Sequence, residues 1–132
     1  MREIKFRGQT KETGELSWVY GSVYYWKKYG KLFPIIGEGV QNGSVQGSIV
    51  ALESVGQFAV VILGGVDLFE GDIFHLGDIN IKYVVVWHDT GLKGKQIGSS
   101  SYVGLTQWKD NIVIIGNQTD NPELLKRKGG KI

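Results

Sequence analysis

The chain has 132 residues, the length of a single domain, and it contains no cysteine. Disulfides, thiolate zinc sites and cysteine nucleophiles are therefore excluded. The formal net charge is +2, but the basic excess comes from the tail after Glu123, and residues 1–125 carry slightly more acidic than basic groups. Such a tail either contacts phosphate groups or only adds solubility.

The first half of the chain reads as short strands separated by glycine-containing turns. Residues 4–7 alternate apolar and charged side chains, and residues 16–26 are rich in aromatic and β-branched residues; both patterns predict strands. In the second segment, alternate positions would place an aromatic stripe on one face. This stripe either packs in the core or forms a stacking platform for bases or sugars, and two lysines follow it directly. The stripe consists of Trp18, Tyr20, Tyr24 and Trp26, and the lysines are Lys27 and Lys28.

Three further features complete this half. Pro34 in the short strand 32–36 is typical of an edge strand. Asn42-Gly43 predicts a tight hairpin turn. The segment Phe58–Leu63 is apolar on both faces, which predicts a strand covered on both sides or an oligomer interface.

The second half also predicts short, regularly spaced strands, a pattern typical of a small barrel or sandwich. Alternate apolar residues from Ile79 to Trp87 predict an inward-facing set, and strands are expected at 102–108 and 112–115. The one good helix start is at 120–125, where Asp120 or Asn121 can cap and Pro122 takes the first helical position. We therefore expect a mainly β chain with one short C-terminal helix, forming a single unit over 1–132 with a possible subdivision into 1–63 and 64–132.

No pattern of side chains predicts catalysis strongly. Asp89-Thr90-Gly91 follows an apolar strand, as the catalytic loop of an aspartic protease does, so a homodimeric aspartic protease-like enzyme is the alternative function. A strand-ending turn explains the same three residues. His75, Asp78, His88 and Asp89 lack the spacing of a metal site, and no dinucleotide or phosphate loop is present. We expect no catalytic residue, no cofactor and no metal site.

Motifs spread along the chain resemble the YopX-like family of phage and prophage proteins. They are Met1–Gly8, Ser54–Phe58, Phe69–Ile73, and Ile115–Asn117 followed by Asp120–Leu125. Residues 30–50 have no counterpart in this resemblance. The resemblance implies an all-β fold with a small SH3-like barrel in the C-terminal part. It implies no catalytic residues, substrate or cofactor.

The sequence thus predicts a non-enzymatic phage or prophage accessory protein that presents a β-barrel surface to a macromolecule. A protein partner or self-association through Phe58–Leu63 is the first expectation, and nucleic acid is the second; a small-molecule ligand is left open. No leader or membrane-spanning pattern is visible, so we expect no membrane contact and a cytoplasmic location in a bacterial host. The candidate binding surface comprises Trp18, Tyr20, Tyr24, Trp26, Lys27, Lys28, Lys126, Arg127 and Lys128.

Overall fold

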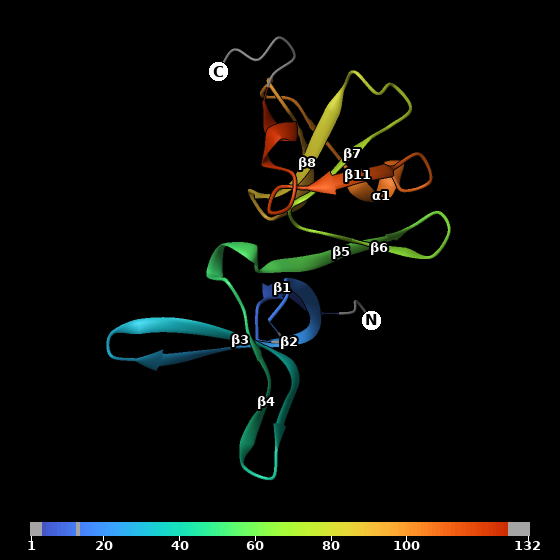
Figure 1. The fold of residues 1–132 in the computed structure, drawn as a ribbon. Coiled ribbons are helices and arrows are strands. Elements are labelled where there is room, and N and C mark those ends of the chain that lie inside the picture. Colours follow the sequence, from blue (N-terminus) through green and yellow to red (C-terminus); the bar gives the residue numbers. More distant parts are fainter. Residues whose placement is uncertain (1–3, 13, 127–132) are drawn as a thin grey trace. The chain divides into compact units, whose positions relative to one another are not determined.

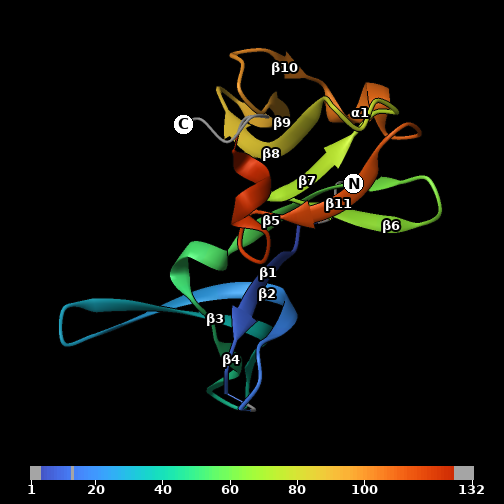
Figure 2. The ribbon, with the colours of Figure 1, turned by 45° about the horizontal axis from the view of Figure 1, so that its top comes forward.

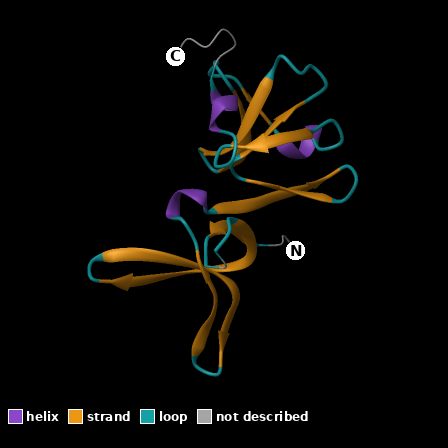
Figure 3. Ribbon diagram, in the orientation of Figure 1, coloured by secondary structure: helices purple, strands orange, loops and turns teal. Residues whose placement is uncertain are grey.

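A computed structural model describes residues 4–12 and 14–126 of the chain. Strands account for most of its regular structure, with one short α-helix and two 3₁₀ turns, so the predicted mainly β class is confirmed (Figure 3). The chain divides into two compact units, Met1–Phe58 and Ala59–Ile132. Strand β5 (Gly56–Ile62) begins in the first unit and ends in the second.

The first unit contributes antiparallel strands in the order β4-β3-β2-β1-β5 to a six-stranded sheet that continues to β6 (Val66–Phe69). Ile36 and Val50 are buried in it and pack against Gly8, where they leave no room for a side chain. Its first four strands are five to twelve residues long. Their bounds are β1 (Phe6–Thr10), β2 (Ser17–Lys28), β3 (Lys31–Gln41) and β4 (Ser44–Ile49), and the 3₁₀ turn η1 spans Leu52–Ser54.

Strands β2 and β3 each change partner partway along their length. Residues 17–21 of β2 pair with β1, whereas residues 22–28 pair with β3. Strand β3 pairs with β2 up to Gly37 and continues beyond it with β4, with a register shift between Ile36 and Gly39. Two hairpins therefore leave the sheet in different directions, as Figure 1 shows. We call the first of them, residues 22–37, the arm.

The change of partner occurs where glycine backbones come together, a site we call the glycine crossing (Gly21, Gly37 and Gly47). A Cβ atom on Gly37 would overlap the Gln46 carbonyl oxygen and the Cα of Gly47. Gly21 and Gly47 also have φ angles of 145° and 155°, which L-residues with side chains rarely adopt. Glycine in a strand often marks such a close approach between backbones.

The second unit contains a five-stranded antiparallel sheet with the order β10-β9-β8-β7-β11 (Figure 2). Its core combines Phe74 and Val85 from this sheet with Ile62, Leu68, Leu105 and Ile112 from the flanking segments. The bounds are β6 (Val66–Phe69), β7 (Asp72–His75), β8 (Lys82–His88), β9 (Gly91–Gln96), β10 (Tyr102–Val103), α1 (Leu105–Trp108), β11 (Val113–Asn117) and the 3₁₀ turn η2 (Pro122–Leu125). In the part of the chain that is described, this sheet is not closed into a ring, so the expected SH3-like barrel is not confirmed.

Two local predictions in the second unit are wrong. Ile79, Ile81 and Trp87 are exposed rather than inward-facing. Asp78 accepts hydrogen bonds from the backbone N–H groups of Asn80 and Ile81, which makes residues 78–81 a turn and delays β8 until Lys82. The expected strand 102–108 becomes helical after Gly104, which brings Leu105 into the core.

The other two corrections concern proline positions. Pro34 lies in β3, which is an inner strand because β4 pairs with it from Ile35 onward. The expected C-terminal helix forms at the predicted place with Pro122 in its first turn, but as the 3₁₀ turn η2. Its N-cap residue, Asn121, makes no capping bond; instead, its Oδ1 accepts a hydrogen bond from the backbone N–H of Asn117.

The glycine crossing makes a stability prediction. Gly37→Ala should destabilise the protein by about 1–3 kcal/mol, because a methyl group has to displace backbone atoms of β4. Gly91→Ala is the matched control, since neither glycine has a positive φ and a Cβ at Gly91 meets nothing within 4 Å. Urea denaturation followed by tryptophan fluorescence measures both variants. Equal stability of the two variants would contradict the importance of this close approach.

Candidate binding surface

The structure separates the predicted aromatic stripe into two pairs. Trp18 and Tyr20 lie on the part of β2 that pairs with β1, where the Arg7 guanidinium lies 4.6 Å from the centroid of the Trp18 ring. Tyr24 and Trp26 lie on the arm, beyond the point where β2 changes partner. The two pairs are separated by Gly21, whose φ of 145° departs from the regular strand backbone on which the alternation of side chains depends.

The arm exposes aromatic rings on both of its faces. On one face, which we call the Trp26 face, the cross-strand pairs are Tyr24 with Ile35, Trp26 with Phe33 and Lys28 with Lys31. The Trp26 and Phe33 rings lie 6.4 Å apart at a tilt of 53°. The opposite face carries the exposed Tyr25, Lys27 and Leu32.

The tip of the arm holds an unusual residue. Tyr29 and Gly30 form the turn, with φ angles of 52° and 76°, the pattern of a type I′ hairpin. For a residue other than glycine, the left-handed conformation costs about 1–2 kcal/mol. Tyr29 is nevertheless 91% exposed, so burial of its ring does not offset this cost. The other hairpin turn, Asn42-Gly43, has similar angles but the residue types that such turns favour, as predicted.

Lysine side chains accompany the rings on the Trp26 face. The Nζ of Lys28 lies 5.0 Å from the centroid of the Trp26 ring and 5.5 Å from that of Tyr29. The arm contains three lysines, five of the chain's fifteen aromatic residues and no Asp or Glu. It is therefore a positively charged, aromatic hairpin.

Sequence reasoning found Tyr24, Trp26, Lys27 and Lys28 but missed four other members of the arm. A signal for them exists in the sequence, because a hairpin centred on Tyr29-Gly30 sets Lys31 opposite Lys28. The same count places Phe33 opposite Trp26. The missed residues are Tyr25, Tyr29, Lys31 and Phe33.

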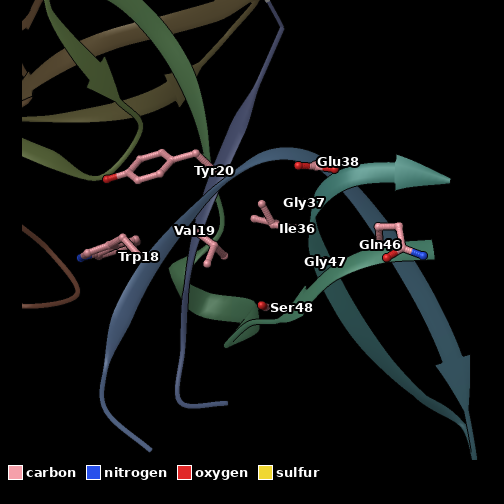
Figure 4. A pocket seen from close by; sticks show the side chains of 9 residues that line it. All are labelled: Trp18, Val19, Tyr20, Ile36, Gly37, Glu38, Gln46, Gly47 and Ser48. Atoms are coloured by element: carbon pink, nitrogen blue, oxygen red, sulfur yellow. The ribbon is translucent and has the colours of Figure 1, made fainter. Parts of the chain in front are cut away.

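Two hollows lie along these strands. One, of about 300 Å³, is lined by Tyr24, Tyr25, Trp26 and Ile35 on the arm. The second, of about 520 Å³, lies at the glycine crossing and carries one carboxylate, Glu38, and one side-chain amide, Gln46. In Figure 4, the Val19 and Ile36 side chains lie at the centre of the lining of the second hollow, and the Trp18 and Tyr20 side chains extend to the other side of β2.

The other residues predicted to contact a partner, those of the C-terminal tail and of the segment 58–63, provide less support for a binding surface. Lys126 is exposed, and Arg127 and Lys128 lie outside the described residues, as do residues 1–3 of the N-terminal motif. Phe58 and Ile62 are buried, but Val61 and Leu63 are exposed. Within the single chain, the apolar segment 58–63 is therefore not covered on both sides, and Val61 and Leu63 are available to the oligomer interface that the sequence also predicts.

The residues considered for catalysis or metal binding lie in turns. Asp89 is exposed and, with Thr90, forms the turn of the β8–β9 hairpin, in which His88 pairs with Gly91. The Nδ1 of His75 accepts a hydrogen bond from the Gly77 N–H, and Asp78 fixes the turn before β8. Within residues 4–12 and 14–126, no three His, Cys, Asp or Glu side chains come close enough together to hold a metal ion.

The motif Glu70-Gly71-Asp72 has a structural role in a turn. Gly71 has a φ of 95°, and the buried Asp72 carboxylate accepts a hydrogen bond of 2.8 Å from the backbone N–H of Phe69. The C-terminal motif is similar: Asn117 Oδ1 accepts hydrogen bonds from the N–H groups of Thr119 and Asp120. Both motifs stabilise turns of the second unit.

Comparison with known proteins gives no assignment, because no protein-family model matches the chain and no match is found among curated proteins. Among the described residues, no helix has the length and apolar character needed to cross a membrane. Inference about function therefore depends on the geometry and chemistry of the arm.

The turn motif makes a second prediction. Asp72→Ala should destabilise the protein by about 1–3 kcal/mol, because the buried N–H of Phe69 loses its acceptor. Asp78→Ala is the control: its carboxylate accepts a similar hydrogen bond at an exposed turn, so its loss should cost less than about 1 kcal/mol. Chemical denaturation compares the two variants. An effect of Asp78→Ala as large as that of Asp72→Ala would show that burial of the motif is not what matters.

Proposed function

We propose that the chain is a non-enzymatic accessory protein of the YopX-like type that binds nucleic acid through its arm. The observation that carries this proposal is the exposed tip of the arm, where aromatic rings and lysines lie together without any acidic residue in residues 22–37. Aromatic side chains combined with positive charge are the usual means of binding single or unpaired nucleotides.

Charge supports a polyanionic partner. Lys27, Lys28 and Lys31 are all exposed and lie within five residues around the turn. Each lysine that neutralises a phosphate releases a counterion, which favours binding at low salt. Although the first 125 residues are slightly acidic as a whole, their charge is locally reversed at the arm.

The conformation of Tyr29 supports a ligand-facing role. Strained residues that burial does not explain tend to be found at binding sites. An Asn at this position would suit the turn better, as it does at residue 42. The exposed tyrosine is therefore better explained by a contact outside the chain than by folding.

Nucleic acid takes precedence here over the protein partner that the sequence first suggested. That expectation depended on the segment 58–63, where only Val61 and Leu63 are exposed apolar side chains. The arm, in contrast, exposes Tyr25, Trp26, Tyr29 and Leu32 beside its three lysines. Its combination of rings and positive charge matches phosphates and bases together.

Charge removal at the arm tests this function. A triple variant, Lys27→Gln with Lys28→Gln and Lys31→Gln, should lose most binding to labelled oligonucleotides at low salt. Any remaining binding should depend less on salt, with the slope of log K against log[salt] smaller by about 2 to 3. Fluorescence anisotropy over a salt series measures both effects.

The control for this experiment removes three lysines of the second unit that lie outside the candidate binding surface, Lys82, Lys93 and Lys109, each changed to Gln. If both triple variants lose binding equally, the arm is not the binding element. If the wild-type chain binds no DNA or RNA at low salt, the proposed function is wrong.

The turn residue gives a separate test. Tyr29→Asn should stabilise the protein by up to about 1 kcal/mol, because Asn tolerates the left-handed conformation, and at the same time weaken nucleic-acid binding. Thermal unfolding and anisotropy measure the two properties on one preparation. A variant that is more stable and binds as well as the wild type would show that Tyr29 contributes nothing to the contact.

A further inference from the structure

We infer that the arm binds single-stranded rather than double-stranded nucleic acid, and that the strand lies along the Trp26 face. This inference rests on the proposed function and adds to it the form of the ligand and the face that receives it. Three observations carry it: the side-chain composition of the arm, the spacing of its rings and the distribution of its lysines.

The composition of the arm is poorly suited to reading a duplex. Sequence-specific readers of the major groove place Arg, Lys, Asn, Gln, Glu or Asp against base edges. Of these residue types, residues 23–36 contain only the three lysines, and they contain no Ser or Thr. Their aromatic rings instead offer flat surfaces, and a base reaches such a surface only when it is free of its partner strand.

The rings of the Trp26 face are suitably spaced for successive bases. Tyr24 and Trp26 are two residues apart on one strand, so they are separated by about 7 Å, twice the ~3.4 Å base spacing within one strand of a duplex. A hollow of about 300 Å³ lies beside them, at the lower end of the volumes usual for small-ligand pockets. An extended strand can therefore place one base at each ring.

The lysines favour the same face. Lys28 and Lys31 are cross-strand partners on the Trp26 face, whereas Lys27 points to the other side. The Nζ of Lys28 is already held near the Trp26 and Tyr29 rings, so little side-chain freedom is lost when it contacts a phosphate. Phosphate and base contacts are thus available from one side of the arm.

The first part of the experiment compares how tightly three ligands bind the full-length chain. Labelled oligothymidylate, a duplex of equal length and inorganic polyphosphate are titrated at one low salt concentration, with anisotropy as the readout. We expect the single strand to bind at least about tenfold more tightly than the duplex, a difference of ~1.4 kcal/mol. Polyphosphate, which has charge but no bases, should bind more weakly than the single strand.

The second part of the experiment compares the effects of single substitutions on oligothymidylate binding. Trp26→Ala should weaken oligothymidylate binding about tenfold, as expected when one stacked base is lost, whereas Trp87→Ala should leave it unchanged. The two tryptophans are similarly exposed, at 48% and 55%, but Trp87 lies in the second unit. Lys28→Gln should reduce the salt slope by about 0.7, and Lys27→Gln, its neighbour on the opposite face, should reduce it less.

A spectroscopic readout separates stacking from a purely structural role for Trp26. Oligothymidylate should quench the tryptophan fluorescence of the wild-type chain. Trp26→Phe keeps an aromatic ring, so it should bind with nearly wild-type affinity yet lose most of this quenching. Trp87→Phe should retain both the wild-type affinity and the quenching.

The outcomes distinguish the two proposals. A duplex bound as tightly as the single strand, or equal losses in Trp26→Ala and Trp87→Ala, overturns the single-strand inference; nucleic-acid binding by the arm then still stands if the lysine triple variant abolishes binding. Equal salt slopes for Lys27→Gln and Lys28→Gln overturn the choice of face. No binding of any nucleic acid overturns both proposals.

Discussion

The close approach of three strand backbones at the glycine crossing is the constraint on which the first unit depends. A side chain on Gly37 would occupy the space of the β4 backbone, and the φ angles of Gly21 and Gly47 disfavour any other residue there. Because the strands come so close, β2 and β3 can exchange partners instead of continuing side by side in one flat sheet. This exchange leaves the outer part of the arm, beyond Tyr24 and Ile35, as a two-stranded hairpin, so the arm is a consequence of where the glycines stand.

A released hairpin has a cost that the fold does not recover. Two strands without a third cannot bury a core, and an isolated two-stranded hairpin is at best marginally stable. The arm retains contacts of its own, such as the tilted Trp26–Phe33 pair and the lysine beside two rings, but Tyr25 and Leu32 stay exposed and Tyr29 is strained. The proposed nucleic acid would cover apolar area left unburied in this way, and its phosphates would lie near the lysines.

Much of the fold could be predicted from the sequence, because the relevant signals are local. Asn42-Gly43 forms the hairpin turn that its residue types predict, and at Glu70-Gly71-Asp72 the positive φ of Gly71 and the Asp72 carboxylate specify the turn locally. The aromatic stripe is less regular than the sequence predicts, because alternation fixes which residues share a face only while the strand backbone stays regular. Gly21 interrupts the stripe between Tyr20 and Tyr24, and glycine inside a strand pattern was the available warning. Likewise, the inward set from Ile79 to Trp87 assumed a strand where the Asp78 turn comes first.

The resemblance to YopX-like proteins and the proposed site concern different parts of the chain. Two of the motifs that carry the resemblance, around Asp72 and Asn117, are hydrogen-bonded turns of the second unit, so their residues are explained by folding alone. The arm extends from Ser22 to Gly37 and contributes to none of those motifs, and its second strand falls in the stretch that has no counterpart in the resemblance. A fold shared with that family would therefore carry no information about the ligand of this chain, because the groups proposed to contact a ligand lie outside the motifs of the resemblance. The chemistry of binding has to be inferred from the arm itself, where rings and lysines lie together on a hairpin that begins at the glycine crossing.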